Sequence, residues 1–263
     1  MDSSPHIRDD EIFLRMNLAE RIQHYLLIST FFLLMVTGLP LFFYEFKAFK
    51  WFFPTERVFY MRGIIHRAAA VVLIANLVWH LFYAAFTARG RNNLKEMIPK
   101  IKDFRNAFEL LWYNVGLTRF LYRLGISKKF FDAHPYWLFK NPPLFGRYNF
   151  IEKFEYWAVG WGSVVMIISG FFMWHVELSL RFFPLWAHDI FVIVHSYEAI
   201  LAFLAVIVWH MYNVHLNPEV FPMSKIWLNG QITGQELRLL HPLEYQKIVE
   251  EREKSLPKNA AAT

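Results

Sequence analysis

The chain has 263 residues, and none of them is cysteine. Without thiolates it cannot ligate an iron–sulfur cluster through cysteine, attach haem through a CxxCH motif or form a disulfide. Any redox centre in this chain must therefore be held by other side chains. The 11 histidines are the natural supply of such ligands.

Charge is missing from four long stretches of the chain. Hydrophobic residues make up 56% of the sequence and aromatic residues 19%, which is more than an average soluble domain contains. The stretches are 25–44, 68–88, 156–174 and 190–216. The first three contain no charged residue, and the fourth contains only Glu198. About 20 apolar residues suffice for a helix to cross a bilayer. The sequence therefore predicts an all-α membrane protein, a four-transmembrane-helix bundle with spans at about 22–44, 63–88, 152–175 and 188–216.

The distribution of lysine and arginine predicts which side of the membrane each connection faces. The N-terminal segment, the connection after the second span and the C-terminal tail hold 3, 13 and 6 basic residues, whereas the loops 44–62 and 175–189 hold 4 and 1. Cytoplasmic loops carry the excess of Lys and Arg. We therefore expect both termini, the connection at 89–151 and the tail at 217–263 in the cytoplasm, in a single membrane domain. This distribution accounts for the formal charge of +6, so we expect no nucleic-acid partner.

The 89–153 connection is more than a plain linker. Its residues 106–126 mix aromatic side chains with arginine, a pattern typical of helices that lie at a membrane surface. We expect interfacial helices here, with a docking surface for a partner subunit as the alternative. The N-terminus is polar and acidic and lacks the short apolar core of a signal peptide.

The first and third spans open with the same motif. Asn17-Leu-Ala-Glu20-Arg21 precedes the first apolar run, and Asn149-Phe-Ile-Glu152-Lys153 precedes the third. Thr37-Gly38 and Ser169-Gly170 then follow at the same distance. The two halves of the chain therefore have a common pattern.

The second and fourth spans repeat a motif as well. Val78-Trp79-His80 in the second span is echoed by Val208-Trp209-His210 in the fourth. Together the repeats indicate two helical hairpins of common origin. His24 of the first span is replaced by Tyr156 in the third, so the two halves are not chemically equal.

Four of the histidines form two spaced pairs. His66 and His80 are fourteen residues apart, about 40° short of four helical turns, and His195 and His210 are fifteen apart, about 60° past four turns. Each pair shares one face of its helix, with its members about 21–22 Å apart along the axis. Two facing helices of this kind make two levels of histidine, one near each membrane surface.

We name these levels by their histidines: His66 and His195 form the outer level, and His24, His80 and His210 form the inner level. Haem iron takes axial histidines, so two bis-histidine haems stacked across the bilayer need four of these five. The outer level offers one pair, whereas at the inner level His210 pairs with either His24 or His80. The remaining histidine would contact a quinone, relay protons or help to bind a third haem. Partners for a third haem would come from the histidines nearer the surfaces, which are His134, His175, His188 and His215.

Two other functions fit the same residues. Intramembrane histidine and glutamate also form proton relays, so a haem-free proton or ion pathway that includes Glu198 is one alternative. A membrane anchor whose haems are mainly structural is the other. A single membrane histidine is often only a hydrogen-bonding group, but five at two depths favour haem.

An ordered set of motifs along all four spans resembles one family. The set consists of 20–24, 61–66, 147–149, His195 with 210–212, and the tail motif 241–245. It is similar to the gamma subunit of membrane-bound formate dehydrogenase and to the cytochrome b subunits of hydrogenase and thiosulfate reductase. No single motif is specific, but their order is.

The resemblance implies a dihaem cytochrome b of a bacterial or archaeal cytoplasmic membrane that passes electrons to menaquinone or ubiquinone. It implies that His66 and His195 ligate the outer haem, and that His24 and His210 ligate the inner one. Asn149 would contact the quinone beside the inner haem. His80 is a further candidate contact because it is the inner-level histidine that this assignment leaves spare, and the resemblance does not imply it. The expected partners are a catalytic redox subunit and an iron–sulfur or multihaem cytochrome c subunit. This chain would be the quinone-reactive electron-transfer subunit of that complex.

Charged side chains lie close to the proposed ligands. Arg62 and Arg67 flank the outer-level histidine of the second span and are candidates for pairing with haem propionates. Arg21 and Lys153 are the matching candidates at the inner level. Glu198, one turn from the outer-level histidine of the fourth span, is a candidate proton-accessible group.

Overall fold

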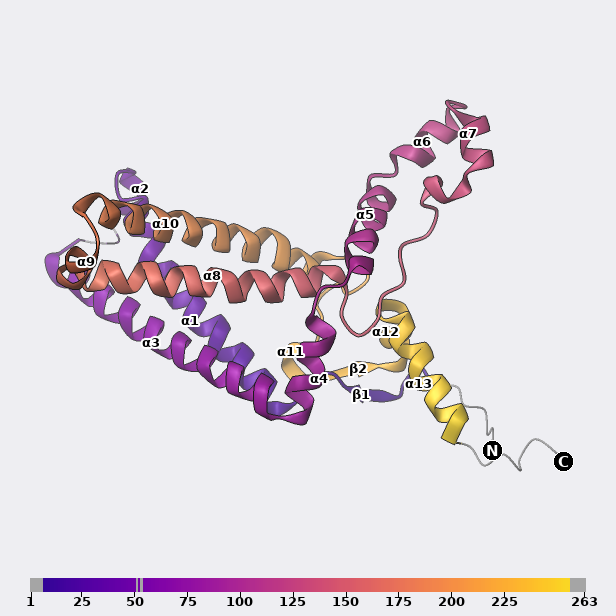
Figure 1. Ribbon diagram of the computed structural model, residues 1–263, viewed down its shortest axis with the longest axis horizontal. Coiled ribbons are helices and arrows are strands. Elements are labelled where there is room, and N and C mark those ends of the chain that lie inside the picture. Colours follow the sequence, from indigo (N-terminus) through magenta and orange to yellow (C-terminus); the bar gives the residue numbers. More distant parts are fainter. Residues whose placement is uncertain (1–6, 51, 53, 256–263) are drawn as a thin grey trace. The chain divides into compact units, whose positions relative to one another are not determined.

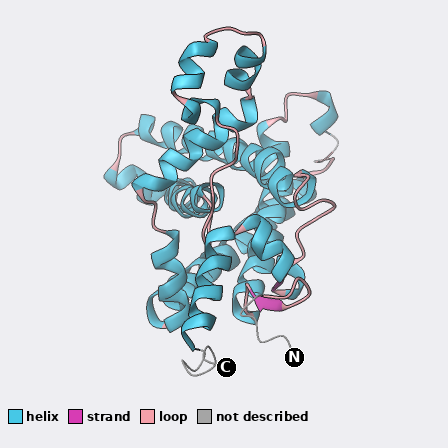
Figure 2. Ribbon diagram, turned by 90° about the vertical axis from the view of Figure 1, so that its right-hand side faces the viewer, coloured by secondary structure: helices cyan, strands magenta, loops and turns pink. Residues whose placement is uncertain are grey.

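The protein is described from a computed structural model that covers residues 7–50, 52 and 54–255. The described residues form helices and one short two-stranded sheet (Figure 2). Four helices are long, namely α1 (Leu18–Phe42), α3 (Glu56–Phe86), α8 (Phe150–Trp174) and α10 (Leu185–Leu204). The shorter elements are β1 (Ile12–Leu14), α2 (Lys47–Lys50), α4 (Ala88–Met97), α5 (Ile101–Val115), α6 (Leu117–Arg123), α7 (Lys128–Ala133), η1 (Pro135–Leu138), α9 (Val176–Phe182), η2 (Ala205–His210), η3 (Tyr212–Leu216), α11 (Ile226–Asn229), β2 (Gln231–Thr233), α12 (Gly234–Leu240) and α13 (Pro242–Ser255).

The chain divides into two compact units. The bundle unit comprises Leu14–Asn93 and Glu155–Gln231 and contains α1, α3, α10 and most of α8. The connection unit comprises Met1–Phe13, Leu94–Phe154 and Ile232–Thr263. In the bundle unit the long helices run alongside one another (Figure 1).

Each predicted span coincides with a helix that is long and apolar enough to cross a membrane, the fourth running from Leu185 to Leu216. The prediction of an all-α membrane protein with four spans is confirmed. The second helix begins at Glu56, earlier than predicted, because Thr55 caps it: the Thr55 hydroxyl oxygen accepts a hydrogen bond from the Val58 amide at 3.3 Å.

The surface of the bundle is suited to lipid. Large apolar side chains on the long helices point outward, for example Phe32, Leu81 and Phe86, which are 65%, 67% and 73% exposed. The buried positions of these helices hold polar residues such as Gln23 and Asn76 beside small or apolar ones. This is the reverse of a water-soluble helix bundle, in which the apolar side chains face inward.

The repeated motif at the start of the first and third spans is a pair of helix caps. In α1 the Asn17 side chain accepts a hydrogen bond from the Glu20 amide at 2.9 Å, and Glu20 accepts one from the Asn17 amide at 2.8 Å. Asn149 and Glu152 make the same reciprocal bonds in α8, at 2.8 and 2.7 Å. This capping box satisfies backbone amides that a helix leaves unpaired at its start.

The fourth span changes helix type part-way. α10 ends at Leu204 and continues into η2 and η3, which are both π-helical. A π turn closes with an i→i+5 hydrogen bond and so takes up one more residue than an α turn. The spacing from His195 to His210 is one residue longer than that of the matching pair in α3, and the π-helical segment absorbs this extra residue.

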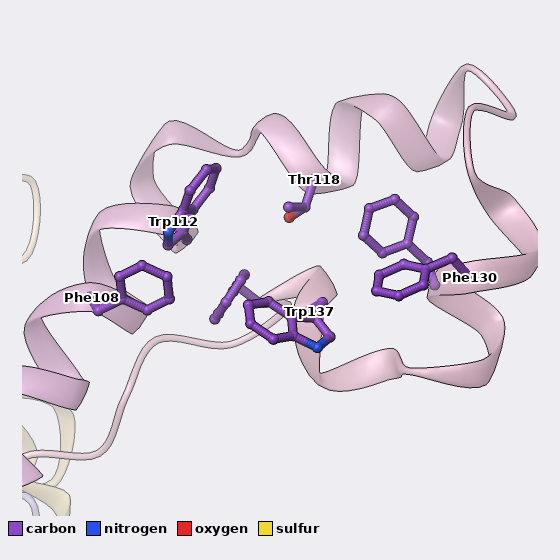
Figure 3. A pocket seen from close by; sticks show the side chains of 7 residues that line it. Phe108, Trp112, Thr118, Phe130 and Trp137 are labelled. Carbon is purple, nitrogen blue, oxygen red and sulfur yellow. The ribbon is translucent and has the colours of Figure 1, made fainter.

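The connection unit holds its own packing. Aromatic rings from α5, α7 and η1 line an open cavity of about 340 Å³, with Phe108 and Trp112 near one end and Phe130 near the other (Figure 3). A buried ion pair joins Lys153 to Asp103, with 2.9 Å between the Lys153 Nζ and an Asp103 carboxylate oxygen. These contacts tie the connection to the first turn of α8.

Candidate functional site

The two outer-level histidines face each other across the bundle. His66 in α3 and His195 in α10 have ring centroids 6.3 Å apart, with the ring planes at 62°. Both side chains are half-buried. The predicted outer level is therefore a direct pair of imidazoles contributed by two different helices.

A hydroxyl group holds each of these rings by its Nδ1 atom. The Thr37 hydroxyl lies 2.8 Å from His66 Nδ1, and the Ser169 hydroxyl lies 3.0 Å from His195 Nδ1. Each hydroxyl also donates its single proton to a backbone carbonyl four residues earlier, that of Leu33 at 2.6 Å in one case. The Ser169 hydroxyl donates to the Val165 carbonyl at 2.7 Å.

This arrangement assigns the tautomer of both rings. A hydroxyl has one proton, and here it is given to a helix carbonyl, so toward the imidazole the oxygen acts as the acceptor. Nδ1 must then carry the ring hydrogen in both His66 and His195, and Nε2 keeps its lone pair. Two neighbouring imidazoles, each with an unprotonated Nε2, provide the type of donor atom that a metal ion takes.

Glycines allow the rings to sit this close to the neighbouring helices. A Cβ atom added at Gly38 would lie 3.3 Å from His66 Cε1, and one added at Gly170 would lie 3.0 Å from His195 Cε1. Either distance is closer than a side-chain carbon normally approaches a ring. The repeated Thr-Gly and Ser-Gly motifs thus supply both the hydroxyl and the space for each outer-level histidine.

Two arginines border the outer level, as the sequence predicts. Arg62 donates a hydrogen bond to the Thr37 carbonyl oxygen at 3.0 Å, and its guanidinium lies 4.9 Å from the Phe59 ring centroid. Arg67 lies over the Trp174 ring at 5.5 Å.

At the inner level, His24 in α1 and His210 in η2 are both half-buried. The His210 Nδ1 lies 2.9 Å from a carboxylate oxygen of Glu155. A carboxylate only accepts, so His210 Nδ1 carries a hydrogen and its Nε2 is left available. Within the described residues, His24 Nδ1 is buried and has no hydrogen-bond partner.

His80 differs from the other four histidines because both of its ring nitrogens have partners. Its Nδ1 lies 2.9 Å from the Gln23 side-chain oxygen, and its Nε2 lies 3.0 Å from the Tyr156 hydroxyl. Asn76 supports this cluster by donating to the Gln23 backbone carbonyl at 2.9 Å. No ring nitrogen of His80 is left over for a metal in this arrangement.

The other charged candidates in the bundle unit have varied surroundings. Glu198 is half-buried and packs against α8, where a Cβ added at Gly162 would lie 2.7 Å from its carboxylate. Arg21 donates a hydrogen bond to the Leu228 carbonyl oxygen at 2.7 Å. Glu198 therefore faces a neighbouring helix, and Arg21 secures the segment that follows the fourth span.

The two candidates in the connection unit both have structural contacts. Asn149 uses its backbone amide and its side-chain oxygen in the cap of α8. Lys153 is 5% exposed and is paired with Asp103. The described hydrogen bonds of Asn149 leave its side-chain amide hydrogens for another partner.

The four histidines nearer the surfaces do not join either level by any described contact. His134 bonds to the Phe130 carbonyl at 3.2 Å, and His175 stacks on Trp174 with a ring-centroid distance of 5.2 Å. In the part of the chain that the structure describes, no group of three or more His, Asp or Glu side chains is arranged to hold a bare metal ion.

Several residues around the histidines were not identified from the sequence as functional. They are Thr37, Ser169, Glu155, Gln23 and Tyr156, each of which contacts a ring nitrogen. For the two hydroxyls a signal existed, because the repeated Thr-Gly and Ser-Gly pairs occupy equivalent places. For the other three, the contact depends on which helices become neighbours.

Comparison with known proteins agrees with the motifs. No protein-family model matches the chain. The formate dehydrogenase cytochrome b556 subunit of Haemophilus influenzae is 23% identical over 232 residues, which are 88% of this chain and 78% of the relative. The formate dehydrogenase cytochrome b556(fdo) subunit of Escherichia coli strain K12 is 23% identical over 225 residues, 85% of this chain and 83% of the relative. The resemblance inferred from the sequence motifs is confirmed by these relatives.

Proposed function

We propose that the chain is a membrane-integral b-type cytochrome subunit that carries electrons through two bis-histidine haems between a partner redox subunit and the quinone pool. The facing pair of His66 and His195 is the observation that carries this proposal. Two imidazoles on opposite sides of one metal, bound at the usual distance of about 2.0–2.1 Å, have ring centroids about 6 Å apart. The measured 6.3 Å fits that arrangement.

The surroundings of the outer pair support the same ligand. Each ring donates its Nδ1 hydrogen to a hydroxyl oxygen, which leaves its Nε2 unprotonated and able to bind a metal. Metal-binding histidines almost always have such a partner on the other ring nitrogen. Arg62 and Arg67 are cations beside His66 and are suited to the propionate groups of a haem.

For the inner haem, we propose His24 and His210 as the ligands. The carboxylate of Glu155 on His210 Nδ1 and the buried His24 Nδ1, which has no partner among the described residues, support this pair. His80 is the weaker candidate, because a ligand at that position would have to give up a hydrogen bond to Gln23 or Tyr156. Arg21 is the proposed propionate partner at this level, with Lys153 as a second.

Haem, when bound, supplies one-electron redox chemistry whose potential the protein sets through its ligands, burial and hydrogen bonds. The residues of this chain fix where that chemistry takes place. Fourteen residues of α3 separate His66 from His80, so the levels lie about 21 Å apart along the helix axis. Two haems at these levels divide the passage across the membrane into two shorter steps.

Reduction of a quinone to a quinol consumes two electrons and two protons, so this chain must supply a path for both. We propose Asn149 as a quinone contact that donates to a quinone carbonyl through its side-chain amide, and His80 in the bundle unit as another candidate contact. Glu198 is the proposed proton-accessible carboxylate near the outer level. Oxidation of quinol uses the same parts in reverse.

The remaining expectations complete this proposal. Both termini and the connection face the cytoplasm, the connection lies on the membrane surface, and electrons enter at the outer level. Aromatic and basic residues in α5 and α6 support the membrane-surface assignment. The names of the relatives favour formate dehydrogenase as the partner complex. The membrane is that of a bacterium or archaeon, and the partners include an iron–sulfur or multihaem cytochrome c subunit.

A visible spectrum of the chain purified from haem-supplied cells tests this proposal. We expect a reduced b-type α band that appears on addition of quinol and disappears on addition of quinone. A preparation without the band would instead favour the haem-free proton pathway. A band that responds to dithionite but not to quinol would favour the anchor with structural haems.

A further inference from the structure

The internal repeat relates the inner-level residues of one half of the chain to those of the other. Positions 132 residues apart correspond, which pairs Gln23 with Glu155 and His24 with Tyr156. The same offset relates Asn17 to Asn149 and Thr37 to Ser169. In the other two spans, the repeated Trp-His motif pairs His80 with His210.

At the outer level, the equivalent residues of the two halves belong to the same site. His66 contacts Thr37 through Nδ1, and its counterpart His195 contacts Ser169 in the same way. The glycine that follows each hydroxyl residue lies against the same ring atom, Cε1. One pair of equivalent histidines therefore makes one site, shared by both halves.

At the inner level, the repeat produces two separate places instead of one. His210 contacts Glu155 through Nδ1 at 2.9 Å, and His80 contacts the equivalent Gln23 through Nδ1 at the same distance. The proposed partner of His210 is His24. The partner of His80 is Tyr156, which is the equivalent of His24.

We propose that His80 and Tyr156 form a second inner haem site that Tyr156 keeps closed. This inference rests on the proposed function, because it takes the pair of His24 and His210 as the open version of the same site. Tyr156 is then the residue that decides how many haems the subunit binds.

The ring geometry supports this equivalence. The centroids of His80 and Tyr156 are 5.7 Å apart with their planes at 63°, close to the 6.3 Å and 62° of His66 and His195. Two rings from facing helices thus adopt the same arrangement at both places.

Tyr156 closes the site by its hydroxyl group. The Gln23 oxygen accepts the Nδ1 hydrogen of His80, so the Tyr156 hydroxyl donates to the His80 Nε2 lone pair. That lone pair is the one a haem iron would use. A phenol that occupies it makes the nitrogen unavailable and satisfies it without metal.

Gln23 stands in the first half where Glu155 stands in the second, and this difference also disfavours haem at His80. Glu155 gives His210 a charged acceptor, which strengthens the imidazole as a metal ligand. Gln23 gives His80 a neutral acceptor, which does so less. Both differences between the halves therefore favour haem at His24 and His210 only, and give electrons a single inner destination.

Haem stoichiometry tests the inference. In Tyr156→His we expect the haem-to-protein ratio to rise from two to three, with an added low-spin signal in electron paramagnetic resonance beside the two wild-type signals. The double variant Tyr156→His/His80→Ala should return to two haems. Tyr156→Phe frees the His80 Nε2 but supplies no second ligand, so it should also keep two. The wild-type signals in each preparation report that the bundle is intact.

The contrary results are equally clear. The inference is wrong if Tyr156→His keeps two haems with both wild-type signals, or if the double variant with His80→Ala still holds three. If Tyr156→His fails to fold, Gln23→Glu/Tyr156→His restores the full ligand environment of the other half and must show the third haem. A wild-type chain that binds no haem contradicts the proposed function instead, and so separates the two failures.

Discussion

The outer and inner levels of the bundle use the same residue type in different settings. At the outer level, two equivalent histidines face each other, and each is held by a neutral hydroxyl from the neighbouring helix. At the inner level, three histidines share the space. One of them contacts a carboxylate, one contacts an amide and a phenol, and one has an unpaired Nδ1 among the described residues.

The difference shows how a duplicated hairpin can hold two unlike centres. At the outer level, equivalent residues of the two halves face each other, so the repeat makes a single site. At the inner level, the equivalent residues form two separate pairs, so one pair can change while the other keeps its residues. Tyr156 and Gln23 are two such changes, and both lie at the inner level.

The largest expected effect is the loss of the outer centre. His66→Ala or His195→Ala should remove one of the two haems and abolish electron transfer from the partner side, because each histidine supplies one of the two axial bonds. Haem content by pyridine haemochrome assay should fall by roughly half. His134→Ala, which changes a histidine of the connection unit, is the matched control and should retain both haems. Full haem content in both outer variants would exclude the outer pair as ligands.

The next prediction separates the two candidates at the inner level. His24→Ala should remove the inner haem, whereas His80→Ala should leave both haems bound, because the His80 nitrogens already have protein partners. The low-spin signals in electron paramagnetic resonance distinguish the outcomes, and each variant serves as the control for the other. The opposite pattern would make His80 the ligand and remove the basis for a closed second site.

A smaller effect is expected at the carboxylate of the inner level. Glu155→Gln should raise the midpoint potential of the inner haem, because a carboxylate beside His210 stabilises the more positively charged oxidised iron. We expect a rise of about 60 mV, which corresponds to roughly tenfold in a one-electron equilibrium. Potentiometric titration measures it, with Glu198→Gln as the control that leaves the inner potential unchanged. An unchanged inner potential in Glu155→Gln would show that this carboxylate does not act on a haem ligand.

The smallest effect concerns the hydroxyls of the outer level. Thr37→Val keeps the shape of the side chain but removes the acceptor of the His66 Nδ1 hydrogen. The outer potential should rise by about half as much as the inner one does in Glu155→Gln, because neutral hydrogen bonds have about half the strength of charged ones. Thr30→Val is the matched control, since Thr30 also donates to a carbonyl one turn back but makes no hydrogen bond to a histidine among the described residues. Equal shifts in the two variants would indicate a general effect on α1.

Much of the fold follows from the sequence, because the four spans are long uncharged runs that have no alternative in a membrane. The start of α3 could not be placed in this way. Its first turn contains Glu56 and Arg57, which hydropathy rejects although Thr55 caps the helix there. The change to π-helix in the fourth span was visible only as a spacing one residue too long between His195 and His210.

The sequence likewise identifies some residues of the candidate site and not others. Residue type and spacing identify the histidines, because helical periodicity fixes which of them share a face. The partners of the ring nitrogens follow from tertiary contacts between helices. Gln23 and Tyr156 meet His80 only because α1, α3 and α8 converge at the inner level, and no local pattern encodes that.

The central claim is that this chain holds two bis-histidine haems in different settings. A potentiometric titration of the wild-type chain, followed by electron paramagnetic resonance, tests it most directly. The account predicts two low-spin haem signals per chain with distinct midpoint potentials, one lost in His66→Ala and the other in His24→Ala. A single haem signal, or two signals that both survive these substitutions, would contradict it.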